Sequence, residues 1–474
     1  MIAPDPLPPL ALEPGPTVEL GAETWSTPAA WGGTLVAADR SGRVTAAGAD
    51  GATRWTVETG EEITASPVVA RLGGEPAVLV GTHGGTLLAL GLDGGVRWRR
   101  HAGAMVRASA SVAEIAGRTA VVWAAYGPRV LCLTPDGQER WSARLPAHGV
   151  YHRGRDAGAV STPMLADIDG DGRVEVVLGT RTSRVVCLDG RTGALRWFRT
   201  LTSDPDSSPS LAVGDGRAAV LVGGGEHTGG TGDRALVALD PADGRELWRA
   251  PAGAGVDSAP LVADLDGDGR PEAAFTTLGS GAVVAVDART GALRWRAPLG
   301  PTDACLHDPA CRRPGAPYVT GKAVCRSYVS PLAADLDADG RLELVAGSNN
   351  GRLVVLDAAT GAERARVETG GMVRGSPVLA DLDESGVCTL AVPSGRRVLT
   401  FGTRAPTAQA WPQFKGDAAH AGQRRPRSAP LAAGDPPWAV RSRLWWSAGP
   451  RDAARWAAVQ AHRRFGLPLL ARPY

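Results

Sequence analysis

The sequence predicts an all-β fold: a single eight-bladed β-propeller of four-stranded blades, followed by a short helical C-terminal tail. Three observations predict it, namely a recurring Trp, a Ser-Pro-like step that opens each repeat, and four short apolar runs within each repeat. Length alone would suggest roughly three domains for 474 residues, because domains average about 150 residues. The repeat replaces that expectation with one closed ring.

The Trp repeat is the clearest of the three signals. The chain has 14 Trp but only 5 Phe and 5 Tyr. Successive gaps of 43, 43, 56, 51 and 47 residues separate the first six repeat Trps, and a seventh follows later, giving Trp55, Trp98, Trp141, Trp197, Trp248, Trp295 and Trp411. An Asp-Gly or Asp…Thr-Gly turn precedes the first six, and the turn at Asp357 has Ala365 in the Trp position. A large aromatic ring at a fixed place in a fourth strand can pack between neighbouring blades.

Each unit also opens with a hydroxyl residue near a Pro, except the third, which has Ser109-Ala110-Ser111. The steps are Thr27-Pro28, Ser66-Pro67, Ser161-Thr162-Pro163, Ser208-Pro209, Ser258-Ala259-Pro260, Ser330-Pro331 and Ser376-Pro377. In the fourth unit, apolar and β-branched runs at 163–167, 174–178, 183–188 and 194–198 alternate with turns. Such runs are strands, and four per unit of 43–56 residues is the pattern of a propeller blade.

The repeat sets the expected domain boundaries. Residues 1–25 form a Pro-rich lead whose segment 17–20 is a candidate ring-closing strand. The propeller spans 26–422, with an insertion at about 301–328, because the sixth-to-seventh interval is longer than its neighbours. Residues 423–474 form a Trp- and Arg-rich tail with a helix expected near 451–464. We expect the tail to pack on the propeller, with binding to a partner or to a membrane surface as the alternatives.

These turns resemble the pyrroloquinoline-quinone-like propeller repeat family, most clearly in the run 186–197, which ends Asp189-Gly-Arg-Thr-Gly-Ala-Leu-Arg-Trp197. The final stretch from Trp411 to Gly422 is similar to the usual terminal blade of that family. The resemblance implies eight blades, as in quinoprotein alcohol dehydrogenases and the propeller lipoprotein of outer-membrane protein assembly. One fold hosts many functions, so it does not imply one activity.

Three blades carry the pattern Asp-x-Asp-x-Asp-Gly-x-x-Glu between their first and second strands. Alternating carboxylates in a tight loop suit calcium, which takes 6–8 oxygen ligands. We therefore expect structural calcium, with the carbonyl of an Arg as one further ligand. The three sets are Asp167, Asp169, Asp171, Arg173 and Glu175; Asp264, Asp266, Asp268, Arg270 and Glu272; and Asp335, Asp337, Asp339, Arg341 and Glu343.

This nine-residue form looks like the loops of integrin-type (FG-GAP-like) propellers. A fourth copy, Asp381/Asp383/Ser385, has Thr389 in place of the Glu, and we expect it to be weak or empty. The alternative for every copy is an ordinary Asp/Gly turn without a metal.

The opposite loop face collects the candidate ligand or catalytic residues. Loops between second and third strands and loops between blades share this face, where propellers usually bind ligands. Besides the catalytic candidates named below, five further polar residues map to this face: His83, Asp204, Asp206, Asp257 and Arg374. A mixed His, Asp and Glu set could support acid–base work or a transition metal, although polar loops are common without either. The catalytic candidates are Tyr151, His152, Arg155, Asp156, Glu226, His227, His307 and Lys322.

The insertion adds Cys305, Cys311 and Cys325 to the same face. One disulfide with a leftover thiol, three free thiols, and a Cys/His metal or reactive site are the competing interpretations. The remaining cysteines, Cys132, Cys187 and Cys388, fall in strands and read as small buried residues.

A binding scaffold for a protein or small ligand is the function that we favour. The alternative is an enzyme, for example of a biosynthetic pathway, with its active site around 301–328. A quinone-dependent dehydrogenase ranks third, and we do not expect PQQ, because the adjacent Cys pair of those enzymes is missing, as is Cys-x-x-Cys-His for haem.

A net charge of +2 and the lack of a long apolar run argue against a nucleic-acid partner and a transmembrane segment, and we expect a monomer. No signal peptide is seen, so the expected compartment is the cytoplasm, or outside it if the start is misassigned. Calcium and a disulfide would favour export.

Overall fold

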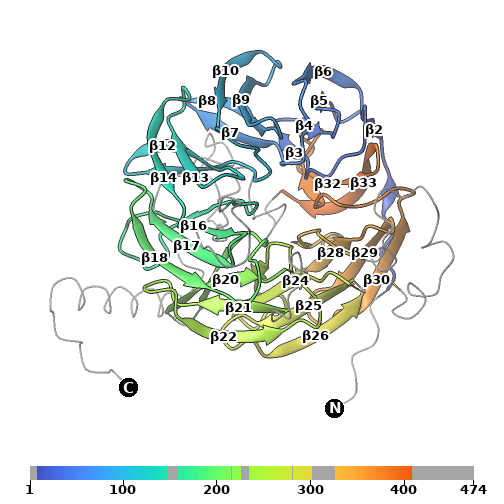
Figure 1. The fold of residues 1–474 in the computed structure, drawn as a ribbon. Helices are drawn as coiled ribbons and strands as arrows, with labels where there is room; N and C mark the ends of the chain where they lie inside the picture. Colours follow the sequence, from blue (N-terminus) through green and yellow to red (C-terminus); the bar gives the residue numbers. More distant parts are fainter. Residues whose placement is uncertain are drawn as a thin grey trace.

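The computed structural model describes residues 8–146, 158–214, 216–225, 234–279, 281–300 and 326–407. These residues form eight sheets arranged in a ring around a central channel, as Figure 1 shows. They contain no helix, and therefore none that is long and apolar enough to cross a membrane. The predicted eight-bladed propeller of four-stranded blades is confirmed. The expected tail helix near 451–464 lies outside the described residues.

The strands of each blade run antiparallel from the channel outward. The innermost strands are β3 (Ala29–Trp31), β7 (Val68–Leu72), β11 (Ser111–Ile115), β15 (Met164–Ala166), β19 (Ser210–Gly214), β23 (Leu261–Ala263), β27 (Leu332–Ala334) and β31 (Val378–Ala380). The second strands are β4 (Thr34–Ala38), β8 (Glu75–Gly81), β12 (Arg118–Ala124), β16 (Glu175–Thr180), β20 (Arg217–Gly223), β24 (Glu272–Thr276), β28 (Glu343–Gly347) and β32 (Val387–Ser394).

The outer half of each blade holds the Trp repeat. The third strands are β5 (Arg43–Ala47), β9 (Thr86–Gly91), β13 (Arg129–Leu133), β17 (Arg184–Asp189), β21 (Ala235–Leu239), β25 (Ala282–Asp287), β29 (Arg352–Asp357) and β33 (Arg397–Pro406). The outermost are β6 (Thr53–Glu58), β10 (Val96–His101), β14 (Glu139–Arg144), β18 (Leu195–Thr200), β22 (Glu246–Pro251), β26 (Leu293–Pro298), β30 (Glu363–Glu368) and, in the eighth blade, β1 (Glu13–Pro14) with β2 (Val18–Glu19).

The hydrophobic core lies between blades rather than within one domain centre. Each of the eight core clusters in the described part joins side chains of two neighbouring blades, and together they cover all eight interfaces. Both faces of the second and third strands are therefore apolar, because each sheet packs against a neighbour on either side.

Each repeat Trp of the described part locks one blade to the next. The Trp141 ring lies against Gly193 in the turn of the following blade, and its Nε1 donates a hydrogen bond to the Gly190 carbonyl at 2.9 Å. Gly193 has a φ of +73°, and a Cβ there would lie 2.6 Å from the Trp141 ring. Glycine is thus required twice, by conformation and by the close approach of the ring. The pairs Trp55–Gly94, Trp98–Gly137, Trp197–Gly244, Trp248–Gly291 and Trp295–Gly361 repeat the contact.

The N-terminal segment closes the ring. Within the expected segment 17–20, β2 pairs antiparallel with β33, and β1 pairs further along the same strand. The missing Trp at position 365 follows from this arrangement, because Ala365 packs in a cluster with Leu10 and Leu12 of that segment. On the other side, Pro16 lies against Gly51, where a Trp of the preceding blade would dock. Trp411 and the rest of the expected last unit after residue 407 lie outside the described residues.

Candidate functional site

A ring of hydroxyl side chains surrounds the channel at the start of each innermost strand. Each hydroxyl oxygen accepts a hydrogen bond from the backbone N–H of its counterpart in the preceding blade, at 2.9–3.2 Å. Around the channel the positions are Thr27, Ser66, Ser109, Thr162, Ser208, Ala259, Ser330 and Ser376, and Ser376 N donates to Thr27 to close the circle. Seven links are made, and the eighth is lost because Ala259 has no hydroxyl to accept from Ser208 N.

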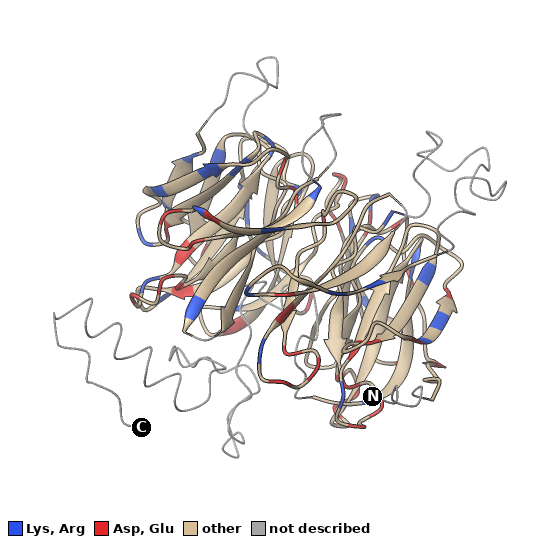
Figure 2. Cartoon of the chain, turned by 90° about the horizontal axis from the view of Figure 1, so that it is seen from below, with Lys and Arg blue, Asp and Glu red and all other residues tan. Residues whose placement is uncertain are grey.

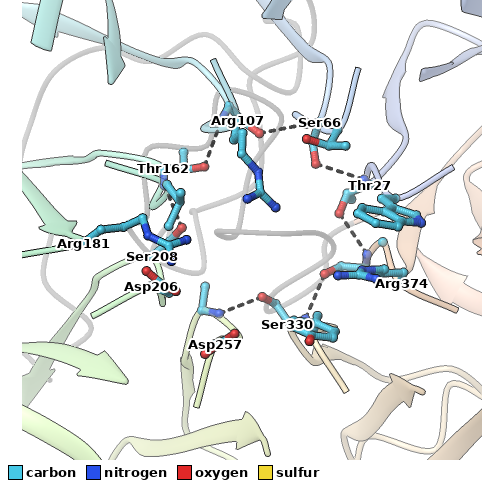
Figure 3. A pocket seen from close by; sticks show the side chains of 18 residues that line it. Thr27, Ser66, Arg107, Thr162, Arg181, Asp206, Ser208, Asp257, Ser330 and Arg374 are labelled. Carbon is cyan, nitrogen blue, oxygen red and sulfur yellow. Dashed lines mark hydrogen bonds between the residues drawn. The ribbon is translucent and has the colours of Figure 1, made fainter. Parts of the chain in front are cut away.

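A cavity of about 200 Å³ lies over this hydroxyl ring at the mouth of the channel (Figure 3). The residues two positions before the hydroxyl residues also line it, one from each blade. We call these eight the recognition ring: Trp25, Thr64, Arg107, Val160, Asp206, Asp257, Tyr328 and Arg374. The hydroxyl layer is nearly uniform, whereas the recognition ring mixes cations, anions, aromatics and apolar groups. Uniform positions serve the architecture, and the varied ones can distinguish ligands.

Charges are distributed unevenly around the recognition ring. Blades five and six contribute the neighbouring Asp206 and Asp257, while Arg374, Trp25, Thr64 and Arg107 follow one another through blades eight, one, two and three. Arg181, from the loop joining β16 and β17, lies beside Asp206 (Figure 3). The cavity therefore has an acidic side and a basic side.

A stack of alternating cations and aromatic rings builds part of the basic side. The Arg374 guanidinium carbon lies 3.6 Å from the centre of the Trp25 ring and 4.4 Å from that of Tyr328. Arg40 covers Trp25 as well, at 4.1 Å, and pairs with Glu62 at 2.6 Å. Cation–π contacts of this kind hold guanidinium planes in place. Arg374 is thus oriented before any ligand arrives.

Asp206 and His83, both at this face, have shifted pKa values. Burial raises the pKa of Asp206 to about 6, while the positive charges of Arg181 and Arg107 oppose the shift and Asp204 adds to it. His83, in the loop joining β8 and β9, contacts Thr64 at 2.7 Å and Glu62 at 3.3 Å. Burial lowers the pKa of His83, against the effect of Glu62.

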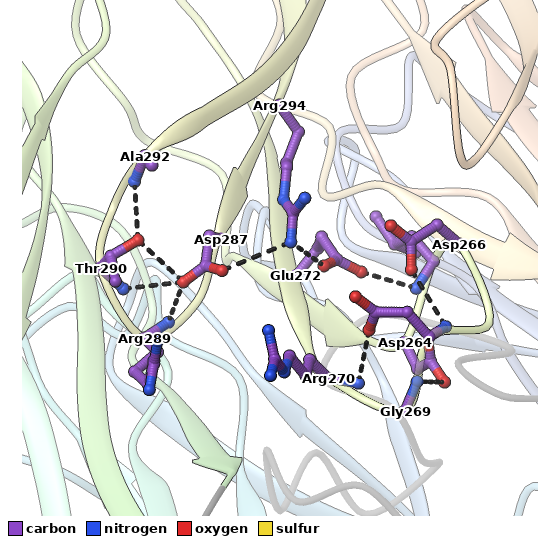
Figure 4. Close-up of polar contacts among 12 residues, drawn as sticks. Asp264, Asp266, Gly269, Arg270, Glu272, Asp287, Arg289, Thr290, Ala292 and Arg294 are labelled. Atoms are coloured by element: carbon purple, nitrogen blue, oxygen red, sulfur yellow. Dashed lines mark hydrogen bonds and ion pairs between the residues drawn. The ribbon is translucent and has the colours of Figure 1, made fainter. Parts of the chain in front are cut away.

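The acidic loops occupy the opposite face, and Figure 2 shows the two loop faces from the side. In the sixth blade, Asp264 accepts hydrogen bonds from Gly267 N and Gly269 N at 2.8 and 2.9 Å, which wraps the loop around its first carboxylate (Figure 4). Asp268 accepts from Arg270 N. In each of the other two loops, the first Asp likewise accepts from two loop N–H groups, and Asp171 and Asp339 accept from Arg173 N and Arg341 N.

Carboxylate oxygens of each loop lie within 4.8 Å of one another, a spacing that could hold a metal ion. The groups are Asp167, Asp169 and Glu175; Asp264, Asp266 and Glu272; and Asp335, Asp337 and Asp339. Burial raises the pKa of Glu175 to about 8 and of Glu272 and Glu343 to about 7. The fourth copy wraps in the same way around Asp381, with Glu384 at a φ of +61°.

An arginine of the outermost strand reaches each of the three complete loops, which the sequence pattern does not reveal. Arg196 contacts Glu175 and lies 2.8 Å from Asp169. Arg294 lies 3.4 Å from both Glu272 and Asp287, thereby linking the acidic loop to the Asp-Gly turn (Figure 4). Arg364 contacts Glu343, Asp337 and Asp339. Each loop thus already contains one cation, supplied by the protein.

The described residues include only part of the predicted loop-face site. The structure brings Asp206, Asp257 and Arg374 to one cavity, with His83 beside it, whereas Asp204 is buried and accepts a hydrogen bond from Ser183. Sequence reasoning missed Trp25, Arg107 and Arg181, although the first two share the repeat position of Asp206. Outside the described residues lie Tyr151, His152, Arg155, Asp156, Glu226, His227, His307, Lys322, Cys305, Cys311 and Cys325.

Comparison with known proteins supports the fold and the repeat. The family model of PQQ_2, described as outer membrane protein assembly factor BamB, matches residues 11–177, 181–266 and 279–435. The chain belongs to that family. No curated protein matches it in sequence.

Three solved structures share its architecture at low identity. BamB from Moraxella catarrhalis has a TM-score of 0.57 at 18% identity, over 83% of this chain and 100% of that one. The quinohemoprotein alcohol dehydrogenase from Comamonas testosteroni has 0.56 at 14%, over 81% and 75%. The computationally designed Ika8 protein has 0.55 at 13%, over 82% and 99%. At these identities the likeness concerns the fold alone.

Proposed function

We propose that this protein is a binding scaffold that holds a protein or small ligand at the channel mouth, with calcium stabilising the opposite face. The observation that carries the proposal is the contrast between the two layers of the mouth. The hydroxyl layer repeats around the ring, while the recognition ring above it differs from blade to blade. Recognition of a partner needs such diversity, and the architecture does not.

Family membership supports a scaffold. The family is described by an assembly factor, so a non-catalytic propeller has a precedent within it. What that assembly factor binds is not carried over to this chain. Recognition depends on the side chains at the mouth, and the solved BamB propeller is only 18% identical.

A photo-crosslinker placed on each face tests the scaffold. Val160, the apolar member of the recognition ring, is half-buried and replaceable by benzoylphenylalanine, and Glu384 in the fourth acidic loop serves as the control position. Irradiation in cells that contain the natural ligand should add mass to the chain only from position 160, as read by intact-protein mass spectrometry. Adducts from position 384 alone would overturn the proposal.

Calcium is the second part of the proposal, with a structural role. The support is the spacing of carboxylate oxygens in the three loops and the wrapping of each loop around its first Asp. Asp167, Asp264 and Asp335 would hold the ion together with the other loop carboxylates and the carbonyls of Arg173, Arg270 and Arg341. Calcium at a free concentration of about 100 times its Kd adds about 2.7 kcal/mol to the free energy of unfolding.

The arginines rank the three loops. Arg364 contacts two aspartates of its loop, Asp337 and Asp339, as well as Glu343. Arg196 contacts one aspartate of its loop, Asp169, as well as Glu175. Arg294 contacts Glu272 and Asp287 and none of the aspartates of its loop. A guanidinium among the ligands competes with calcium, so the sixth-blade loop should bind calcium most tightly. Calorimetric titration should show that D264N removes the tightest of the three sites and D335N the weakest. The reverse order would contradict the ranking, and no calcium binding would contradict the proposal.

A further inference from the structure

The side chains of the recognition ring indicate which kind of ligand the channel mouth binds. This inference rests on the proposed function. Hydroxyl groups form the floor of the cavity. Ser66, Ser109 and Ser330 each accept a hydrogen bond from a neighbouring backbone N–H, which occupies the oxygen lone pairs on the side facing that blade. Within the described chain no acceptor takes their own O–H protons. The floor can therefore donate hydrogen bonds upward into the cavity.

Arg107 adds a cation above this floor. Its guanidinium points toward the middle of the cavity (Figure 3), and among the described residues it makes no hydrogen bond or ion pair. A half-buried guanidinium with five N–H donors is best satisfied by a bidentate oxyanion. Arg374 lies on the same side, beyond Thr64 and Trp25 as seen from Arg107, and is held between two aromatic rings.

Asp206 and Asp257 face this basic side across the ring, from blades five and six (Figure 3). A simple anion filling the cavity would meet these carboxylates and be repelled by them. A simple cation would meet Arg107 in the same way. A ligand with an anionic end toward Arg107 and an ammonium end toward the acid pair avoids both repulsions.

We infer that the channel mouth binds a small zwitterion of amino-acid size, with its carboxylate at Arg107 and the hydroxyl floor and its ammonium at Asp206 and Asp257. The cavity of about 200 Å³ has room for a ligand of this size. The carboxylate accepts from N–H and O–H donors, while the ammonium donates to the acid pair.

A series of ω-amino acids, from glycine to 6-aminohexanoate, tests the inference by calorimetric titration. Its members differ only in the distance between ammonium and carboxylate, so the ring should select one length. That member should bind at least about tenfold more tightly than its matched carboxylic acid and its matched amine. If the matched acid binds equally well, the mouth is an anion site and the inference is wrong.

Variants connect the binding to the named groups. R107Q should weaken binding of the selected zwitterion by about tenfold or more and bring it close to that of the matched amine. The combined D206N and D257N variant should bring it close to the matched acid. R99Q and E75Q change exposed side chains on β10 and β8 and should bind as the wild type does. Circular dichroism confirms folding, and R107K, which keeps the charge but not the fork, replaces R107Q if that variant unfolds.

Two failures remain distinguishable. If no member of the series binds at about 10 mM while a crosslink still forms from position 160, the scaffold stands and the zwitterion is excluded. If neither is observed, the proposed function fails as well.

Discussion

The guanidinium of Arg364 lies 2.5 Å from Oε1 of Glu343, and both side chains are buried beneath the acidic loop of the seventh blade. Only 2% of the Arg364 side chain and none of the Glu343 side chain are exposed. Breaking such a pair by removing one partner leaves an uncompensated buried charge, at a cost of about 3–5 kcal/mol.

R364M should therefore lower the free energy of unfolding strongly in the absence of calcium, and added calcium should recover part of the loss by taking the place of the guanidinium. R366M on the same strand is the matched control, because Arg366 pairs with Glu363 at the surface and that pair contributes under about 1 kcal/mol. Urea denaturation with and without chelator measures both. Equal losses in the two variants would show that Arg364 does not stabilise the loop.

Gly193 and Gly60 separate the two roles of glycine in the blade turns. Both have a φ near +75°, but a Cβ at Gly193 would meet the Trp141 ring at 2.6 Å, whereas at Gly60 it meets nothing within 4 Å. G60A should cost about 1–2 kcal/mol for the left-handed conformation alone. G193A should cost about 1–3 kcal/mol more, since the Trp must also move. Thermal unfolding of the two variants measures the difference, and equal melting temperatures would mean that the Trp contact contributes nothing.

The hydroxyl ring predicts two changes of opposite sign. A259S supplies the missing eighth acceptor, opposite Ser208 N, and should stabilise the protein by about 1 kcal/mol. S330A removes the acceptor of Ala259 N and should destabilise it by about 1–3 kcal/mol, because a buried N–H is left unpaired. Equilibrium denaturation measures both, and the ring has no energetic role if both variants match the wild type.

Binding of the zwitterion should depend on pH through Asp206. Its pKa is raised to about 6 by burial, with Arg181, Arg107 and Asp204 as the charged neighbours. Below that pH the carboxyl is neutral and cannot pair with an ammonium, so affinity should fall as pH is lowered through about 6. The raised pKa also means that the folded chain retains a proton which the unfolded chain releases between about pH 4 and 6, so stability contributed by this group falls as pH rises across that window.

D206N should remove that pH dependence and leave unchanged His83, a described group at the same face whose pKa is lowered by burial. Calorimetric titrations of the selected ω-amino acid at pH 5, 6 and 7 compare the two proteins. An unchanged pH profile in D206N would assign the dependence to another group.

Much of the architecture could be predicted from the sequence because it repeats. Trp141 and Gly193 belong to a contact that recurs in units of 43–56 residues, and steps such as Ser66-Pro67 open seven of the eight units, so the repeat alone indicated eight blades. The roles of Leu10 and Pro16 could not be predicted, since they replace repeat contacts with residues from outside the repeat.

The candidate site was harder to predict for the opposite reason. Arg107 and Trp25 share a repeat position with Asp206, but a position occupied by different residue types in each blade shows no pattern. What marks the position in the sequence is its location, two residues before each residue of the hydroxyl ring. The pairing of Arg364 with Glu343 could not be predicted from the sequence. Arg364 precedes the Trp position of its blade, but an arginine precedes most of the repeat Trps, including those of blades without an acidic loop.

The most direct test of the two-faced scaffold is a crystal structure of the protein purified in calcium from cells that contain its natural ligand. We expect ligand density over the hydroxyl ring in contact with Arg107, and calcium at the loop of Asp264. Ligand density on the acidic-loop face, with only ordered water over the hydroxyl ring, would contradict it.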